Sequence, residues 1–86
     1  MNRVLKEMKH QRWRALAMLN DGTEALICLG NTVANVRESY LEPWLELFDE
    51  DVRKETDEIV LQKWIGEPDR GEWVTQANLP LLQMAL

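Results

Sequence analysis

The sequence predicts a small α+β fold, a single-domain sandwich in which a β-hairpin is followed by a long or kinked helix and by one or two further strands. Three observations predict it. Two apolar runs flank the turn residues Asn20, Asp21 and Gly22, which is a hairpin signature. Apolar residues then recur at steps of three or four from Val33 to Leu47, as in a core-facing helix. In the last third of the chain, apolar and polar residues alternate as in β-strands, so a three- or four-stranded antiparallel sheet is expected.

An 86-residue chain with 45% hydrophobic and 29% charged residues has the profile of one folded domain. We expect a short helical segment over residues 1–10, a single α+β domain over 11–80 and an apolar tail over 81–86. No apolar run approaches the roughly 20 residues that span a bilayer, so no membrane association is expected. The expected location is the cytoplasm, because the one cysteine, Cys28, cannot form an internal disulfide and suits a core position.

The hairpin is predicted from residues 10–32, HQRWRALAMLNDGTEALICLGNT. A two-residue turn at Asp21 and Gly22 would put Glu24 on the same face as the apolar residues of the first strand. A three-residue loop, with Gly22 in the left-handed conformation, gives an almost wholly apolar face instead. We therefore predict the three-residue loop. The predicted core face comprises Trp13, Ala15, Ala17, Leu19, Thr23, Ala25, Ile27 and Leu29.

The helix predicted after Gly30 has Asn31 or Thr32 as its cap. Pro43 interrupts the apolar stripe of this helix, because proline removes a backbone hydrogen bond and crowds the preceding turn at a cost of about 3 kcal/mol. Either the helix kinks, or one helix ends near Leu41 and a second begins with Pro43 in its first turn. The stripe continues through the proline, which favours the kink.

The last third of the chain predicts further strands. Residues 58–65, EIVLQKWI, are typical of a strand, although so short a stretch also fits a continued helix. GEPDRG is a turn by composition, and Pro80 limits the following strand to a sheet edge. We predict that Trp64 and Trp73 form a cross-strand pair packed against the domain. If the turn is instead an open loop, these residues form an aromatic clamp for a partner.

Catalytic and metal-binding patterns are missing from the sequence, so we predict no enzyme, no cofactor and no metal site. His10 and Cys28 occur once each and lie far apart, which disfavours zinc. The chain has neither a glycine-rich phosphate loop nor a glycine-framed nucleophile. Glu38, Glu42 and Glu46 follow at four-residue spacing, so a carboxylate-based metal-dependent enzyme is the third hypothesis, although a solvated helix face explains them better.

The charge distribution indicates a protein partner. The net charge is −5, the first fourteen residues are basic, and the remainder is acidic, most strongly in FDEDVRKETDE at 48–58. An acidic body repels phosphate and attracts basic protein surfaces, which disfavours nucleic acid as the partner. Four tryptophans in a short chain also fit a binding role, since tryptophan is enriched among interface hot spots.

The stretch from Arg12 to Trp44 combines a hairpin with LGNTVANVRESYLEPW, in which G-x-T opens an amphipathic helix. This arrangement resembles the HicB-type antitoxins over less than half of the chain. Pro43 interrupts the helix, and GEPDRGEW has no counterpart in that pattern. The resemblance therefore implies no residue role for this chain.

We predict a non-enzymatic protein-binding domain, a small acidic inhibitor or adaptor of the antitoxin-like or phage anti-defence-like kind, which acts by occupying the surface of a protein partner. The partner is expected to have a basic surface. The alternative is a self-associating structural subunit, a homodimer joined through an exposed edge strand or through its oppositely charged segments. The predicted partner-binding residues are Asp49, Glu50, Asp51, Asp57, Glu58, Asp69 and Arg70.

Overall fold

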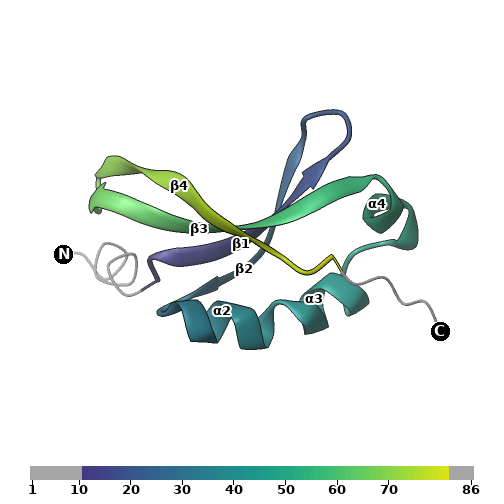
Figure 1. The fold of residues 1–86 in the computed structure, drawn as a ribbon, viewed down its shortest axis with the longest axis horizontal. Coiled ribbons are helices and arrows are strands. Elements are labelled where there is room, and N and C mark those ends of the chain that lie inside the picture. Colours follow the sequence, from purple (N-terminus) through teal and green to yellow (C-terminus); the bar gives the residue numbers. More distant parts are fainter. Residues whose placement is uncertain (1–10, 82–86) are drawn as a thin grey trace.

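The computed structural model describes residues 11–81, which form strands and short helices (Figure 1). The strands are β1 (Trp13–Leu19), β2 (Glu24–Gly30), β3 (Thr56–Glu67) and β4 (Arg70–Leu79), and the helices are α2 (Val33–Ser39), α3 (Leu41–Glu46) and α4 (Glu50–Lys54). The helical segment predicted at 1–10 and nearly all of the predicted tail lie outside the described residues. Among residues 11–81, no helix has the length and apolarity needed to cross a membrane.

One sheet contains the four strands in the order β2-β1-β3-β4, and each neighbouring pair is antiparallel. The α+β class and the four-stranded antiparallel sheet are therefore confirmed, and residues 58–65 belong to a strand. β1 and β3 are the central strands, whereas β2 and β4 are the edges. The two longer helical segments, α2 and α3, run along one face of the sheet (Figure 1).

The core lies between the sheet and the α2–α3 segment. Trp44, Ile59 and Val36 are the largest fully buried side chains. Ala15 and Ala17 of β1 are also fully buried, and they are small enough to let the helices approach the sheet closely. The buried cluster comprises Ala15, Ala17, Ile27, Val36, Tyr40, Trp44, Ile59, Leu61 and Leu79. Removal of these side chains from water is the main stabilising contribution to the fold.

The turn between β1 and β2 ends in a left-handed glycine. The Leu19 N–H donates to the Thr23 carbonyl at 2.9 Å, and the Gly22 N–H donates to the Leu19 carbonyl at 3.0 Å. Gly22 has φ 89°, a conformation that glycine adopts at no steric cost. Beyond the loop, Ala17 stands opposite Ala25, and both pack in the core that the helices cover.

A β-bulge in β2 changes the predicted register. The pairing shifts so that Gly30, and not Leu29, stands opposite Trp13. The prediction that Leu29 lies on the core face is therefore wrong, because this residue pairs with Arg14 and is 42% exposed. The physical reason is space for α2, since a Cβ on Gly30 would lie 2.8 Å from the Val36 side chain. A larger residue opposite Trp13 would have to push the helix away from the sheet.

The helix that follows β2 is bent at Tyr40, between α2 and α3. Thr32 caps α2, because its hydroxyl oxygen accepts the N–H of Asn35 at 3.1 Å. A helical hydrogen bond crosses the bend, from the Trp44 N–H to the Tyr40 carbonyl at 3.1 Å. Pro43 is the third residue of α3, where a helix needs no N–H donor. The structure thus combines the two predicted alternatives, a bend and a new first turn that contains the proline.

β4 completes the sheet at the edge away from β2, and Pro80 follows its last residue. A second β-bulge, at Gln76, breaks the predicted alternation of this strand. Ala77 packs against the core, whereas Thr75 lies on the other face, where Gln62 donates to its hydroxyl at 3.1 Å. Both edge strands therefore carry a bulge, which interrupts the row of backbone donors and acceptors that another strand would need. This disfavours the edge-strand route to a homodimer.

Candidate functional site

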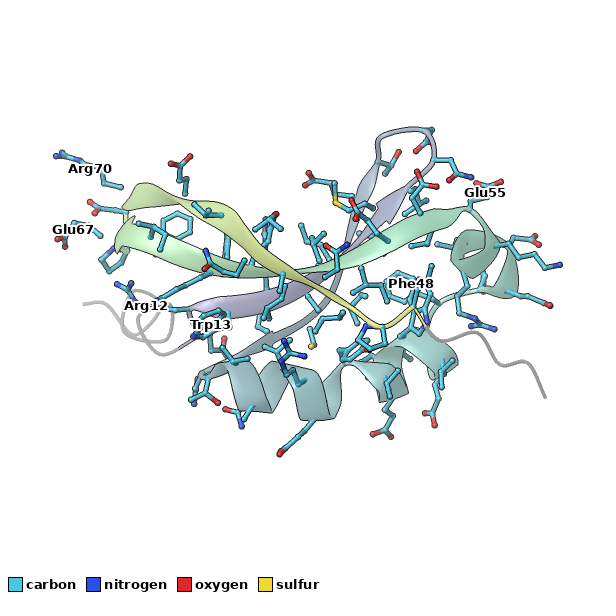
Figure 2. The ribbon with its side chains drawn as sticks, in the orientation of Figure 1. Arg12, Trp13, Phe48, Glu55, Glu67 and Arg70 are labelled. Atoms are coloured by element: carbon cyan, nitrogen blue, oxygen red, sulfur yellow. The ribbon has the colours of Figure 1, made fainter. Side chains whose placement is uncertain are left out.

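Carboxylates gather at one end of the molecule, where α4, the start of β3 and the β1–β2 turn meet. Figure 2 shows Glu55 at this end. The backbone N–H of Asn20, in the turn, donates to the Glu55 carbonyl at 2.7 Å and so holds the two segments together. We call this region the acidic end. It contains eight exposed residues, Asp21, Glu24, Asp49, Glu50, Asp51, Glu55, Asp57 and Glu58.

The short helix α4 positions the first of these carboxylates. Asp49 is its N-cap residue, and Glu50 and Asp51 occupy its first turn. The positive end of the helix dipole favours negative charge there, which explains why acidic residues begin this helix. Arg53 and Lys54 occupy the last turn, where the dipole favours positive charge.

The chain passes directly from α4 into β3 through an anchored threonine. Thr56 is only 6% exposed, and its hydroxyl donates to the Val52 carbonyl at 2.8 Å. Asp57 and Glu58 follow, and both are exposed. The side-chain amide of Asn78 donates to the Glu58 carboxylate at 3.1 Å, which limits the positions that this carboxylate can take.

The structure brings most of the predicted partner-binding residues together and separates two of them. The residues united at the acidic end are Asp49, Glu50, Asp51, Asp57 and Glu58. Asp69 and Arg70 belong to the β3–β4 turn, and Figure 2 shows Arg70 at the opposite end of the molecule. Sequence reasoning missed three residues, Asp21, Glu24 and Glu55. Asp21 and Glu24 reach the acidic end only through the pairing of β1 with β2 and β3, whereas Glu55 belongs to the acidic stretch 48–58 that the sequence had singled out.

The cations near the acidic end do little to neutralise it. Within residues 11–81 the one ion pair joins Lys54 and Glu50 at 3.8 Å, and both side chains are exposed, so the pair contributes little. Arg53 donates to the carbonyls of Leu45, at 3.2 Å, and of Phe48, near the C-terminal end of α3. Because the Arg53 guanidinium is bound to carbonyls at the end of α3, it neutralises little of the nearby carboxylate charge. The electrostatic potential of the acidic end therefore stays negative.

Trp64 and Trp73 form the predicted cross-strand pair. They stand opposite each other, with ring centroids 5.4 Å apart in an edge-to-face arrangement. The Trp64 indole N–H donates to the Glu67 carbonyl at 2.7 Å, and the guanidinium of Arg14 lies 4.2 Å from the Trp73 ring centroid. Both tryptophans are half-buried and lie outside the core cluster, on the face away from the helices. The pair therefore closes the hairpin and does not join the core.

The other candidate residues do not form a recognisable centre. Glu38, Glu42 and Glu46 are exposed, and the bend at Tyr40 falls within their row. In the part of the chain that the structure describes, no group of three or more His, Cys, Asp or Glu side chains is placed to hold a metal ion. His10 lies outside the described residues.

Cys28 is a half-buried thiol in β2 that packs against the core. Burial raises its pKa, and hydrogen bonds involving Ser39 and Ala15 oppose the shift without cancelling it. Because the thiolate is the reactive form, we expect iodoacetamide to modify Cys28 more slowly in the folded protein than in urea at the same neutral pH. Mass spectrometry of timed samples measures both rates. Equal rates would show that the fold does not protect this thiol.

Comparison of the chain with protein-family models, with curated proteins and with solved structures found no match. The charge and geometry of the described surface are therefore the basis on which a function can be inferred.

Proposed function

We propose that this protein is a non-enzymatic binding domain that occupies a basic surface of a protein partner through its acidic end, as a small inhibitor or adaptor does. The observation that carries the proposal is the excess of exposed carboxylates there, eight against the two cations Arg53 and Lys54. A surface of this kind speeds encounter with a positively charged partner and selects it by charge complementarity. The same field repels the phosphates of nucleic acids.

Binding suits these carboxylates better than acid–base catalysis does. A general acid needs a carboxyl whose pKa is raised by burial or by a like charge. The pKa of Asp21 is lowered instead, chiefly by hydrogen bonding to Thr23, whose N–H donates to the Asp21 carboxylate at 2.9 Å. The carboxylates are also exposed, whereas catalytic acids work in sites that exclude water.

The test compares two triple variants that remove the same number of charges. The acidic-end variant carries Glu50→Gln, Asp51→Asn and Asp57→Asn. The matched control carries Glu38→Gln, Glu42→Gln and Glu46→Gln, on the exposed side of α2 and α3. Because all six side chains are exposed, both variants should melt within about 3 °C of the parent.

A partner is first captured from a lysate of the source cells on immobilised wild-type protein, and it is then purified and titrated against both variants. The acidic-end variant should bind about tenfold more weakly, since three surface charges contribute about 0.5 kcal/mol each. The control should bind within about twofold of wild type, and added salt should weaken the wild-type complex. Equal affinities of the two variants would contradict the proposal, and so would a partner whose contact surface is acidic.

A further inference from the structure

The face of the sheet opposite α2 and α3, which we call the open face, has its own pattern. In the part of the chain that the structure describes, no helix lies over it (Figure 1). Directly opposite residues of neighbouring strands share a face, so the registers define rows across the sheet. The first row comprises Leu29, Arg14, Gln62 and Thr75, the middle row Leu26, Leu16, Val60 and Asn78, and the third row Glu24, Met18 and Glu58.

The middle row is mainly apolar and reaches solvent at its β2 end. Leu16 and Val60 are buried, but Leu26 is 50% exposed. Leu29 lies beside it in the first row and is 42% exposed. It reaches this face only because of the bulge in β2, since regular alternation would turn it toward the helices. The fold therefore holds two neighbouring leucines in water, although burying them would be favourable.

The rows on either side of the apolar row carry opposite charges. On one side is Arg14, whose guanidinium is held 4.2 Å from the Trp73 ring centroid. On the other side are Glu24 and Glu58, which are both exposed. Each charged row lies two residues along β1 from Leu16, in opposite directions, which is about 7 Å in an extended strand. The charges are thus placed nearly symmetrically about the apolar row.

From this pattern we infer that the protein forms a symmetric dimer in which the open faces of two copies meet. A two-fold axis along the middle row exchanges the outer rows, so Arg14 of each copy stands opposite the partner's Met18, with the partner's Glu24 and the partner's Glu58 on the strands to either side. The apolar middle rows meet at the centre, where Leu26 of each copy leaves water, while Leu29, in the first row, comes to lie against the partner's third row. A second copy is the occupant that fits, because this rotation sets Arg14 between two carboxylates of the other copy and lays the two apolar middle rows on each other.

The dimer shares only two residues with the acidic end and leaves the rest of the proposed partner site free. It covers Glu24 and Glu58, whereas the carboxylates of α4 and the β1–β2 turn remain available. Each dimer therefore presents two acidic ends, and it can bind a multivalent basic partner with raised avidity. An experiment can contradict one proposal and leave the other standing, because the partner test changes Glu50, Asp51 and Asp57, none of which belongs to the three rows.

A charge exchange tests the dimer with the full chain. In Arg14→Glu, position 14 repels the partner's Glu24 and the partner's Glu58. In the double variant Glu24→Arg with Glu58→Arg, both positions repel the partner's Arg14. Light scattering should give each variant alone the mass of one chain, 10.1 kDa, at micromolar concentrations where wild type has twice that mass. Mixing the two variants restores both sets of attractive contacts, so the mixture should regain the dimer mass.

The leucines provide an independent test that does not disturb the charges. Leu26→Lys should raise the dimer dissociation constant about a hundredfold, because symmetry removes an apolar contact twice, while the folded monomer remains. Leu47→Lys is the matched control, since Leu47 is 77% exposed near the end of α3 and lies outside the rows. This variant should dimerise like wild type.

Three results would overturn the inference. The first is a wild-type mass of one chain at these micromolar concentrations. The second is a mixture of the two charge variants that stays monomeric while circular dichroism shows both to be folded. The third is an equal effect of Leu26→Lys and Leu47→Lys, and this comparison decides alone if Arg14→Glu loses its fold together with the Trp73 contact.

Discussion

Replacing Trp44 by alanine should lower the free energy of unfolding by about 3 to 5 kcal/mol, because the indole is fully buried in the core. Its ring packs against Phe48, with centroids 5.3 Å apart. Ala15 and Ala17 belong to the same buried cluster and are too short to reach into the space that the ring would vacate. Small domains have a total stability of about 5 to 15 kcal/mol, so the variant should be partly unfolded at room temperature.

Urea denaturation followed by far-UV circular dichroism measures this loss. The matched control is Leu47→Ala, the cap position of the same helix, because Leu47 is 77% exposed. This control should change the free energy of unfolding by less than about 0.5 kcal/mol. Equal denaturation midpoints for Trp44→Ala and Leu47→Ala would show that α3 does not pack on the sheet through Trp44.

The spacing of apolar residues predicted the strands and the bent helix, because within one strand or helix this spacing marks the face that is buried. The periodic patterns could not predict the β-bulges in β2 and β4. In β2 the residues Ala25, Ile27 and Leu29 alternate without a break, and nothing in that alternation signals an inserted residue. The register shifts because α2 must approach the sheet opposite Trp13, where Gly30 leaves room. That requirement comes from tertiary packing, and it is also what places Leu29 on the open face.

The candidate site was partly visible in the sequence for a related reason. The carboxylates of α4 and early β3 are contiguous in the chain, so local charge density identified them. Asp21 and Glu24 join them only when β1 pairs with β3, which local patterns do not record. The equal spacing of Trp64 and Trp73 around the turn predicted that they pair. It did not predict on which face of the sheet the pair lies. β3 carries apolar residues on both faces, so alternation could not choose between them.

Replacing Gly71 by alanine should weaken the outer hairpin by about 1 to 3 kcal/mol, because two backbones approach there too closely for a side chain. A Cβ on Gly71 would lie 2.3 Å from the Ile65 carbonyl oxygen. On the opposite strand, a Cβ on Gly66 would lie 2.6 Å from the Arg70 carbonyl oxygen, and Gly66 also has φ 120°. The obstructing atoms belong to the backbone and cannot rotate aside. Alanine must therefore push β3 and β4 apart near the turn.

This displacement has a spectroscopic signature, because the Trp64 and Trp73 rings lie 5.4 Å apart, close enough for their transitions to couple. Gly71→Ala should lose the exciton-coupled circular dichroism band of the indoles at temperatures where the rest of the sheet is intact. Gly22→Ala is the control, because an added Cβ there meets nothing within 4 Å. Only its left-handed backbone is strained, by about 1 kcal/mol, and the indole band should persist. Loss of the band in both variants, or in neither, would contradict close backbone approach as the reason for the glycine pair.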